Sequence, residues 1–157
     1  MKQLLIIILM LTGYKSLSAN EIGKKQKREE DILIVVYTAR GHIGIPYRYG
    51  GKDSNGLDCS ALIQNSFKSA GYEVPRTSTE QSKCGKNITW SNVREGDLVF
   101  FTFNKDGKKW NHSGLITLAQ NGEIKFVHSS SSKGVVESDL LADYYKDNVI
   151  GFRRVIK

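Results

Sequence analysis

Apolar residues at helical spacing mark the first structural element of the chain. In the stretch 29–44 they recur three and four positions apart, the period of one helix face, and they are Ile32, Val35, Val36 and Ala39. Gly41 and Gly44, followed by Pro46, interrupt this pattern, so we expect the helix to end there. Residues 20–29 before it are polar and charged, and we expect them to form a short exposed lead-in.

A second helix is predicted to begin at Cys59. Asp58 is a residue type favoured at helix N-caps, and Gly71 suits the position just after a helix, so this helix should run from Cys59 to Ala70. The apolar residues that share a helix face with Cys59 are Leu62, Ile63, Phe67 and Ala70. We therefore expect this face, with its thiol, to pack against the rest of the fold.

From Gly96 onward the pattern changes to runs of β-branched and aromatic residues, which are typical of strands. The runs are DLVFFTF, HSGLITLA, EIKFVHSS and VIGFRRVI. Turn residues separate them at 105–107 and at Asn121-Gly122. Helices followed by consecutive strands predict an α+β domain, with the helix that carries Cys59 packed on an antiparallel sheet.

Residues 1–19 have the pattern of a secretory signal peptide. Lys2 supplies a positive start, residues 4–11 are an unbroken apolar run, and small residues up to Ala19 suit cleavage. The run is shorter than the roughly 20 residues of a membrane-spanning helix, and the segment has no cysteine for a lipid anchor. We therefore expect an exported protein, periplasmic or extracellular at the cell wall, with no stable membrane anchor.

Length and charge bound the domain and its partners. A chain of 157 residues suits one domain with a sizeable core, which we place at residues 30–157. The formal net charge of +7 tolerates an acidic partner such as a cell wall, a membrane surface or a nucleic acid. The Lys and Arg residues are scattered and form no basic motif, so we expect a solvated basic surface, no nucleic-acid partner and a monomer.

Cys59 is the first candidate for chemistry. At a helix start, free backbone N–H groups and the positive end of the helix dipole favour a thiolate, the nucleophilic form of cysteine. A cysteine on an apolar helix face can also be a core residue, and the local pattern fits both interpretations. Cys84 is expected to be free or buried; the alternative in an exported chain, a Cys59–Cys84 disulfide, would abolish the nucleophile.

A nucleophilic thiol needs a base, and the chain contains three histidines. His42 falls at the end of the first predicted helix and is expected in a loop or on the surface. His112 and His128 fall on predicted strands, each on the same side as apolar residues. We expect the helix that carries Cys59 to cover both, so that one imidazole accepts the thiol proton and the other orients the first.

The loop between these two strands decides whether the imidazoles share a face. Residues paired across a hairpin point to the same face, and their numbers have a constant sum. With a two-residue Asn121-Gly122 turn this sum is odd, whereas 112 and 128 have an even sum. Both histidines reach one face only if the loop holds an odd number of residues or a strand bulges. We predict a three-residue loop, residues 120–122, with Gly122 in the left-handed conformation, or a longer odd loop.

The segments IPYRYGG, GLDCSALIQ, VPRTSTEQ, REGDLVFF, NHSGLI and FVHSSSSKGVV follow one another in the chain. In this order they resemble the successive motifs of the NlpC-type cysteine peptidases, from roughly residue 30 to the end. The resemblance implies a papain-like fold and hydrolysis of the peptide stems of bacterial peptidoglycan, most often beside D-glutamate at the bond to the diamino acid. It implies no cofactor and no metal, and the spacing of the cysteine and histidines is not a usual zinc spacing.

The resemblance also implies roles for individual residues. Cys59 is expected to be the nucleophile, His112 the base and His128 the orienting residue, while the Tyr47 hydroxyl and the Cys59 N–H would stabilise the oxyanion. The expected substrate-binding residues are Asp58, Ser60, Arg76 and Ser129, the last in a polar loop beside His128. Structural explanations stay open for most of these residues: packing for Tyr47, an N-cap for Asp58, and a pin for the loop that holds Arg76.

Some positions depart from the family pattern. The usual DCSG is DCSA here, and Ala61 suits a helix interior better than glycine. The HVG form is HSG, with Ser113 on the opposite side of its strand from the neighbouring imidazole. Two other function classes stay open: a non-catalytic cell-wall-binding module of the same fold, in which Cys59 is structural, and a thiol acyltransferase that acts on lipid acyl chains.

Overall fold

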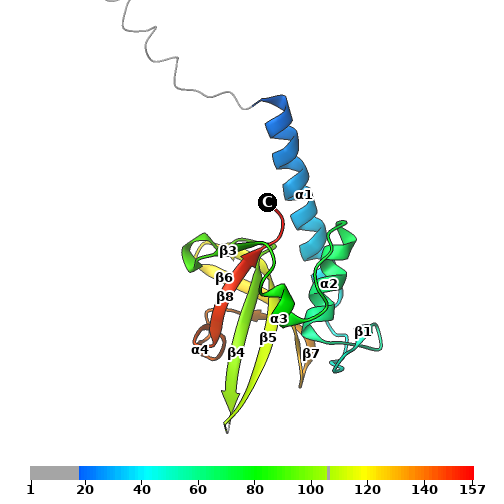
Figure 1. Ribbon diagram of the computed structural model, residues 1–157, viewed down its shortest axis with the longest axis vertical. Coiled ribbons are helices and arrows are strands. Elements are labelled where there is room, and N and C mark those ends of the chain that lie inside the picture. Colours follow the sequence, from blue (N-terminus) through cyan, green and yellow to red (C-terminus); the bar gives the residue numbers. More distant parts are fainter. Residues whose placement is uncertain (1–17, 106) are drawn as a thin grey trace, which may run out of the picture.

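The computed structural model describes residues 18–105 and 107–157, whose arrangement Figure 1 shows. At its centre is a sheet with the strand order β3-β8-β4-β5-β6-β7 and antiparallel pairing between all neighbours. Its strands are β3 (Lys86–Ile88), β4 (Leu98–Lys105), β5 (Lys108–Gln120), β6 (Glu123–Ser130), β7 (Gly134–Asp139) and β8 (Val149–Arg154). The α+β architecture expected from the sequence is confirmed.

Helix α1 (Ala19–Gly41) ends where the apolar pattern predicts but begins earlier. Ser18 and Glu21 form a capping box at its N-terminus, with Glu21 N–H donating to Ser18 Oγ at 3.3 Å. The expected lead-in, residues 20–29, is therefore exposed and helical, and it projects from the body of the domain in Figure 1. The expected signal peptide lies outside the described residues except for its last two positions. Within the described part of the chain, no helix has the length and apolar character needed to cross a bilayer.

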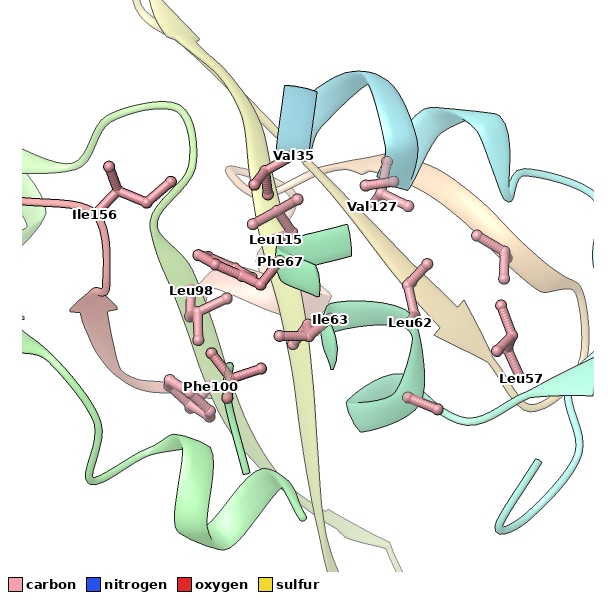
Figure 2. Close-up of a cluster of buried hydrophobic side chains, with 14 residues drawn as sticks. Val35, Leu57, Leu62, Ile63, Phe67, Leu98, Phe100, Leu115, Val127 and Ile156 are labelled. Atoms are coloured by element: carbon pink, nitrogen blue, oxygen red, sulfur yellow. The ribbon is translucent and has the colours of Figure 1, made fainter. Parts of the chain in front are cut away.

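Helix α2 (Cys59–Ser69) is the second predicted helix. Asp58 is its N-cap, and Gly71 follows the C-cap with a φ of +81°, a left-handed conformation that glycine adopts without strain. The buried side chains Leu62, Ile63 and Phe67 enter the main hydrophobic cluster, which lies between α1, α2 and one face of the sheet (Figure 2). On the sheet this cluster contains Leu98, Phe100, Leu115 and Val127.

The opposite face of the sheet carries a second apolar cluster. Its buried members include Phe101, Phe103, Phe126 and Phe152. Partly buried Tyr145, from the short helix α4 (Asp143–Lys146), packs against it. The sheet therefore has a helix-covered face and an aromatic face, and alternate residues of β4, β5 and β6 point to one or the other.

The hairpin between β5 and β6 differs from the predicted loop. Gln120 pairs with Glu123, so the turn contains two residues, Asn121 and Gly122, with φ values of 53° and 80°. The prediction of an odd loop is therefore wrong. The register shifts by one residue between Ile116 and Leu118, so a bulge at Thr117 supplies the even sum that places His112 and His128 on one face.

Several shorter elements were not foreseen from the sequence. Strands β1 (Lys52–Asp53) and β2 (Gly56–Leu57) form a small antiparallel pair before α2. Helix α3 (Ser78–Gln81), the 3₁₀ helix η2 (Trp90–Asn92), β3 and β7 complete the fold. These segments are short or polar, so their apolar period is too weak to show in the sequence.

Phe67 anchors the helix that carries Cys59, because its ring is fully buried in the main cluster. We expect Phe67→Ala to lower the free energy of unfolding by about 3–5 kcal/mol, through lost burial and the cavity left behind. Phe67→Leu, which keeps most of the apolar contact, should cost less. Urea unfolding followed by circular dichroism measures both, and equal losses in the two variants would contradict the packing described.

Candidate active site

The N-cap of α2 holds Cys59 in the first turn of the helix. The Asp58 backbone is extended, with φ −88° and ψ 171°, and its Oδ1 accepts the backbone N–H of Ala61 at 2.7 Å. This contact satisfies one of the free donors of the first turn. The Ser60 N–H of the same turn favours negative charge on the Cys59 sulfur.

Arg76 braces this turn from outside the helix. Its two terminal nitrogens donate to the Asp58 carboxylate at 2.7 and 3.0 Å, and Nη1 also donates to Ser60 Oγ at 2.8 Å. Ser60 Oγ in turn donates to Asp58 Oδ1 at 3.0 Å. Burial by itself would raise the pKa of Asp58, but the hydrogen bonds from Arg76, Ala61 and Ser60 outweigh it and lower the pKa. Three expected substrate-binding residues thus form one network beneath Cys59.

Two imidazoles form the second part of the site. His112 Nε2 and His128 Nδ1 lie 2.9 Å apart, with the two rings at 83°. One of these nitrogens must donate and the other accept, because two neutral rings share one hydrogen between them. The structure therefore joins the two histidines that the sequence singles out by a direct hydrogen bond. The third histidine, His42, is the C-cap residue of α1 and is not part of this pair.

Two hydroxyl groups lie within hydrogen-bonding distance of the other ring nitrogen of His128. Its Nε2 lies 3.0 Å from Ser138 Oγ in β7 and 3.2 Å from the Tyr145 hydroxyl in α4. Sequence reasoning missed both residues. Ser138 and Tyr145 lie in short elements without a strong apolar period; the β6–β7 register brings Ser138 to the imidazole, and the packing of α4 brings Tyr145 there.

Both histidines lie on the aromatic face of the sheet. His112 stands opposite Phe101 in β4, and His128 stacks on Phe126 with 4.7 Å between ring centroids. The expectation that both face the helix carrying Cys59 is therefore wrong. The reason is that α2 covers the alternate positions of β5, which are Ser113 and Leu115.

The thiol meets β5 at Ser113, the residue next to His112. The Ser113 hydroxyl and N–H, together with the Ser60 N–H, favour negative charge on the sulfur, but burial outweighs them and raises the pKa of Cys59. The Cys59 thiol is therefore protonated at neutral pH. The helix N-terminus alone does not produce the preformed thiolate that the sequence suggested, because the sulfur is too strongly desolvated.

Burial also acts on the two imidazoles. It lowers the pKa of His112 to about 4. Burial, aided by the charges of His112 and Lys133, lowers the pKa of His128 to about 3. Both rings are therefore neutral over the physiological range, so either can accept a proton or a hydrogen bond at pH 7.

Tyr47 and Ser129 flank the segment that leads into α2. Tyr47 forms an isolated bridge with Leu57. The pKa of its hydroxyl is raised by burial first and then by the charges of Cys59 and Asp58, which places the phenol near both groups and keeps it protonated. Ser129 is a buried residue of β6, not of a loop, because the strand continues to Ser130. Its hydroxyl donates to the Leu57 carbonyl at 2.7 Å and so ties β6 to the approach to Cys59.

A small pocket of about 60 Å³ opens beside His112. Strand β8 pairs with β4 only as far as Phe101. The lining residues are Ser78, Thr79, Ser82, Phe100, Phe101, Asn111, His112 and Ile150. The imidazole is therefore reachable from the side of α3.

No cluster of His, Cys, Asp and Glu among residues 18–105 and 107–157 could hold a metal ion. Both cysteines are free thiols in the structure. Cys84 lies just after α3, where its Sγ donates to the Glu80 carbonyl at 3.5 Å.

Residues 44–154 match the NlpC/P60 family. The chain belongs to this family. Over 114 residues it is 39% identical to the Escherichia coli protein named "Murein DD-endopeptidase MepS/Murein LD-carboxypeptidase", covering 72% of this chain and 57% of that one.

Two further NlpC/P60 relatives bear on the extent of the likeness. The "Probable endopeptidase NlpC" of Escherichia coli is 31% identical over 157 residues, which cover 97% of both chains. A solved NLP/P60 structure from Staphylococcus aureus superimposes with a TM-score of 0.68 at 30% identity, over 82% of this chain and 42% of that one. The chain thus spans little more than half of its MepS relative. These likenesses confirm the papain-like fold that the motifs imply.

The N-cap network predicts unequal effects at position 58. Asp58→Asn removes the charge but keeps a side-chain oxygen that can accept the Ala61 N–H, whereas Asp58→Ala removes every side-chain acceptor for Ala61 and for Arg76. We expect the alanine variant to lose about 1–3 kcal/mol of unfolding free energy and the asparagine variant less. Urea unfolding at pH 7 measures the difference, and a harmless Asp58→Ala would show that the network does not hold α2.

The buried imidazoles predict an acid-sensitive fold. Below about pH 6.5 the unfolded chain protonates His112 and His128, while the folded chain, with pKa values of about 4 and about 3, does not. The unfolded state then binds more protons, so the free energy of unfolding should fall as pH falls from about 6.5 to about 4. Urea midpoints measured across this range should fall less steeply in His128→Gln. Parallel slopes in the two proteins would contradict the burial of His128.

Proposed function

We propose that this protein is an exported cysteine endopeptidase that hydrolyses the peptide stems of bacterial peptidoglycan. The observation that carries the proposal is the 2.9 Å hydrogen bond between the two imidazoles, of which His112 directly precedes Ser113, the β5 residue that acts on the Cys59 thiol. The names of two relatives, a murein endopeptidase and carboxypeptidase and a probable endopeptidase, support peptidoglycan as the substrate.

In this proposal His112 is the general base. Its Nε2–H donates to His128 Nδ1, which leaves Nδ1 of His112 free to accept the thiol proton. His128 then carries its hydrogen on Nε2 and donates it to Ser138 Oγ or to the Tyr145 hydroxyl. The orienting residue is thus a neutral imidazole that holds the tautomer of the base, as the third member of a catalytic triad does.

The reaction proceeds by acyl transfer to sulfur. Sγ of Cys59 loses its proton to His112 as it attacks the carbonyl carbon of the scissile amide, and the carbonyl oxygen becomes an oxyanion. The Cys59 N–H and the protonated Tyr47 hydroxyl donate to that oxygen, and loss of one such donor typically costs about 10²–10³ in rate. The His112 imidazolium protonates the leaving amine, and water activated by the same imidazole releases the acyl group from sulfur.

The proposal also assigns roles to the pocket beside His112 and to the four expected substrate-binding residues. The pocket beside His112 lies on the side to which the imidazole delivers a proton, so it is proposed to hold the residue that leaves as the amine. Asp58 and Ser60 position the nucleophile. Arg76, whose side chain stays 36% exposed, is the member of that network proposed to meet a stem carboxylate. Ser129 acts by holding the segment before Cys59.

We further propose a signal peptide at residues 1–19, a single catalytic domain at 30–157 and action as a monomer at the cell wall. The bond beside D-glutamate, to the diamino acid, is the proposed site of cleavage. The MepS relative is named for other bonds, a DD-endopeptidase and an LD-carboxypeptidase bond, so fragment masses must decide this point.

Digestion of purified peptidoglycan, with mass spectrometry of the released fragments, tests the proposal. Wild type should release stem fragments, whereas Cys59→Ala and His112→Ala should release only traces. Cys84→Ser and His42→Ala are matched controls, because they change the other free thiol and the remaining histidine without touching the site, and they should keep activity. Digestion by Cys59→Ala would overturn the proposal. Tight binding of the wall without fragments would favour a wall-binding module instead.

The orienting role of His128 predicts that its variants lose activity to different degrees. His128→Gln keeps an acceptor for the His112 N–H, whereas His128→Ala removes it. We expect the alanine variant to lose roughly 10–10³ in kcat, less than the about 10⁴ found when an orienting aspartate is removed, because a neutral ring stabilises an imidazolium less than a carboxylate does. The glutamine variant should lie between the alanine variant and wild type. Full activity of His128→Ala, with circular dichroism matching wild type, would leave a Cys–His dyad.

A further inference from the structure

Ser113 is a buried polar residue whose hydroxyl has no apparent structural use. Its side chain is fully buried, and its Oγ has no hydrogen-bond partner within the described part of the chain. A buried hydroxyl without a partner destabilises the folded state relative to an apolar side chain of the same size. We therefore expect the Ser113 hydroxyl to find a hydrogen-bond partner during function.

The location of Ser113 identifies that partner. On β5 it stands opposite Phe100, and Leu115 lies two residues further on the same face. Phe100 and Leu115 both belong to the cluster that α2 covers. The Ser113 side chain therefore points toward α2, and its hydroxyl and N–H lie close enough to the Cys59 sulfur to favour negative charge on it.

We propose that Ser113 is the hydrogen-bond donor that stabilises the Cys59 thiolate. This inference deepens the proposed function, on which its catalytic meaning rests. The thiol is a weak hydrogen-bond acceptor, so in the resting site the hydroxyl stays without a full partner. When the proton leaves Sγ for His112, the sulfur keeps the electron pair and becomes an anion. The Ser113 O–H then donates to that anion in a charge-assisted hydrogen bond, about twice as strong as a neutral one.

The other groups around the sulfur make this donor necessary. Asp58 places a negative charge nearby and, like burial, raises the pKa of the thiol. Tyr47 is protonated and Arg76 is engaged by the Asp58 carboxylate, although both lie close enough for the thiolate charge to raise their pKa values. His112 is neutral because of burial. Of the contributions that favour the thiolate, the Ser113 hydroxyl is the largest, followed by the Ser113 and Ser60 N–H groups.

The test follows the reaction of Cys59 with iodoacetamide from pH 6 to pH 11, with peptide mass spectrometry that separates Cys59 from Cys84. In Ser113→Ala the pH midpoint of alkylation should rise by about one unit, since a hydrogen bond to a charged group is worth about one pKa unit or more. The rate at pH 7 should therefore fall about tenfold, while the rates at high pH converge. Ser113→Thr keeps a hydroxyl and should keep the wild-type midpoint.

Ser66→Ala is the matched control, because Ser66 is also fully buried in α2 but its hydroxyl donates to the Leu62 carbonyl at 2.8 Å. This variant should lower the urea midpoint and leave the alkylation midpoint unchanged. Ser113→Ala should do the reverse, with a urea midpoint equal to or above that of wild type, because it removes an unsatisfied buried hydroxyl.

Two results would overturn the inference: an unchanged alkylation midpoint in Ser113→Ala, or a fall in its urea midpoint as large as that of Ser66→Ala. The experiment uses no peptidoglycan, so either result would leave the digestion test of the proposed function standing. Conversely, a chain that releases no wall fragments can still show the shifted thiol midpoint.

Discussion

The bulge at Thr117 is the constraint on which the site depends. Without it, the two-residue turn at Asn121-Gly122 would place His112 and His128 on opposite faces of the sheet. Thr117 is held on both sides: its Oγ1 donates to Glu137 Oε1 in β7 at 2.6 Å, and its carbonyl accepts from Arg40 of α1 at 3.3 Å. Arg40 and Glu137 are themselves paired at 2.8 Å. Helix α1 and the edge strand β7 therefore fix the register that aligns the imidazoles.

The electrostatics of the site follow from burial on both faces of β5. The helix-covered face desolvates the thiol and raises its pKa, while the aromatic face desolvates the imidazoles and lowers theirs. Neutral thiol and neutral imidazole are thus the resting pair. In the proposed mechanism charge appears only as the sulfur attacks, and its partners are already in place: the Ser60 N–H and the Ser113 hydroxyl and N–H donate to the sulfur, and His128 Nδ1 accepts from the imidazolium.

Much of this arrangement was predictable because it rests on strong local patterns. The N-cap Asp58, the apolar face of α2 and the four apolar runs after Gly96 each specify an element by themselves, and the structure contains all of them. The pairing of His112 with His128 was also anticipated, although through an odd loop, whereas a strand bulge provides it.

The features that the sequence predicted wrongly or missed depend on contacts between distant segments. The helix-covered face of β5 was assigned to the wrong set of residues, because alternation along one strand does not say which of two apolar faces a helix covers. Ser138, Tyr145 and the Arg76 network needed the register of β7 and the course of the loop after α2. The extension of α1 through residues 20–29 depended on the capping box at Ser18, which the expected cleavage site concealed.

The proposed mechanism depends most directly on the direction of the hydrogen bond between the two imidazoles. Nitrogen-15 NMR of histidine-labelled protein at pH 7 reports which ring nitrogen carries the hydrogen. We expect both rings to be neutral and His112 and His128 each to carry their hydrogen on Nε2, with Nδ1 of His128 as the acceptor. A hydrogen on Nδ1 of His128, bonded to an unprotonated Nε2 of His112, would leave no base for the thiol and would contradict the proposed mechanism.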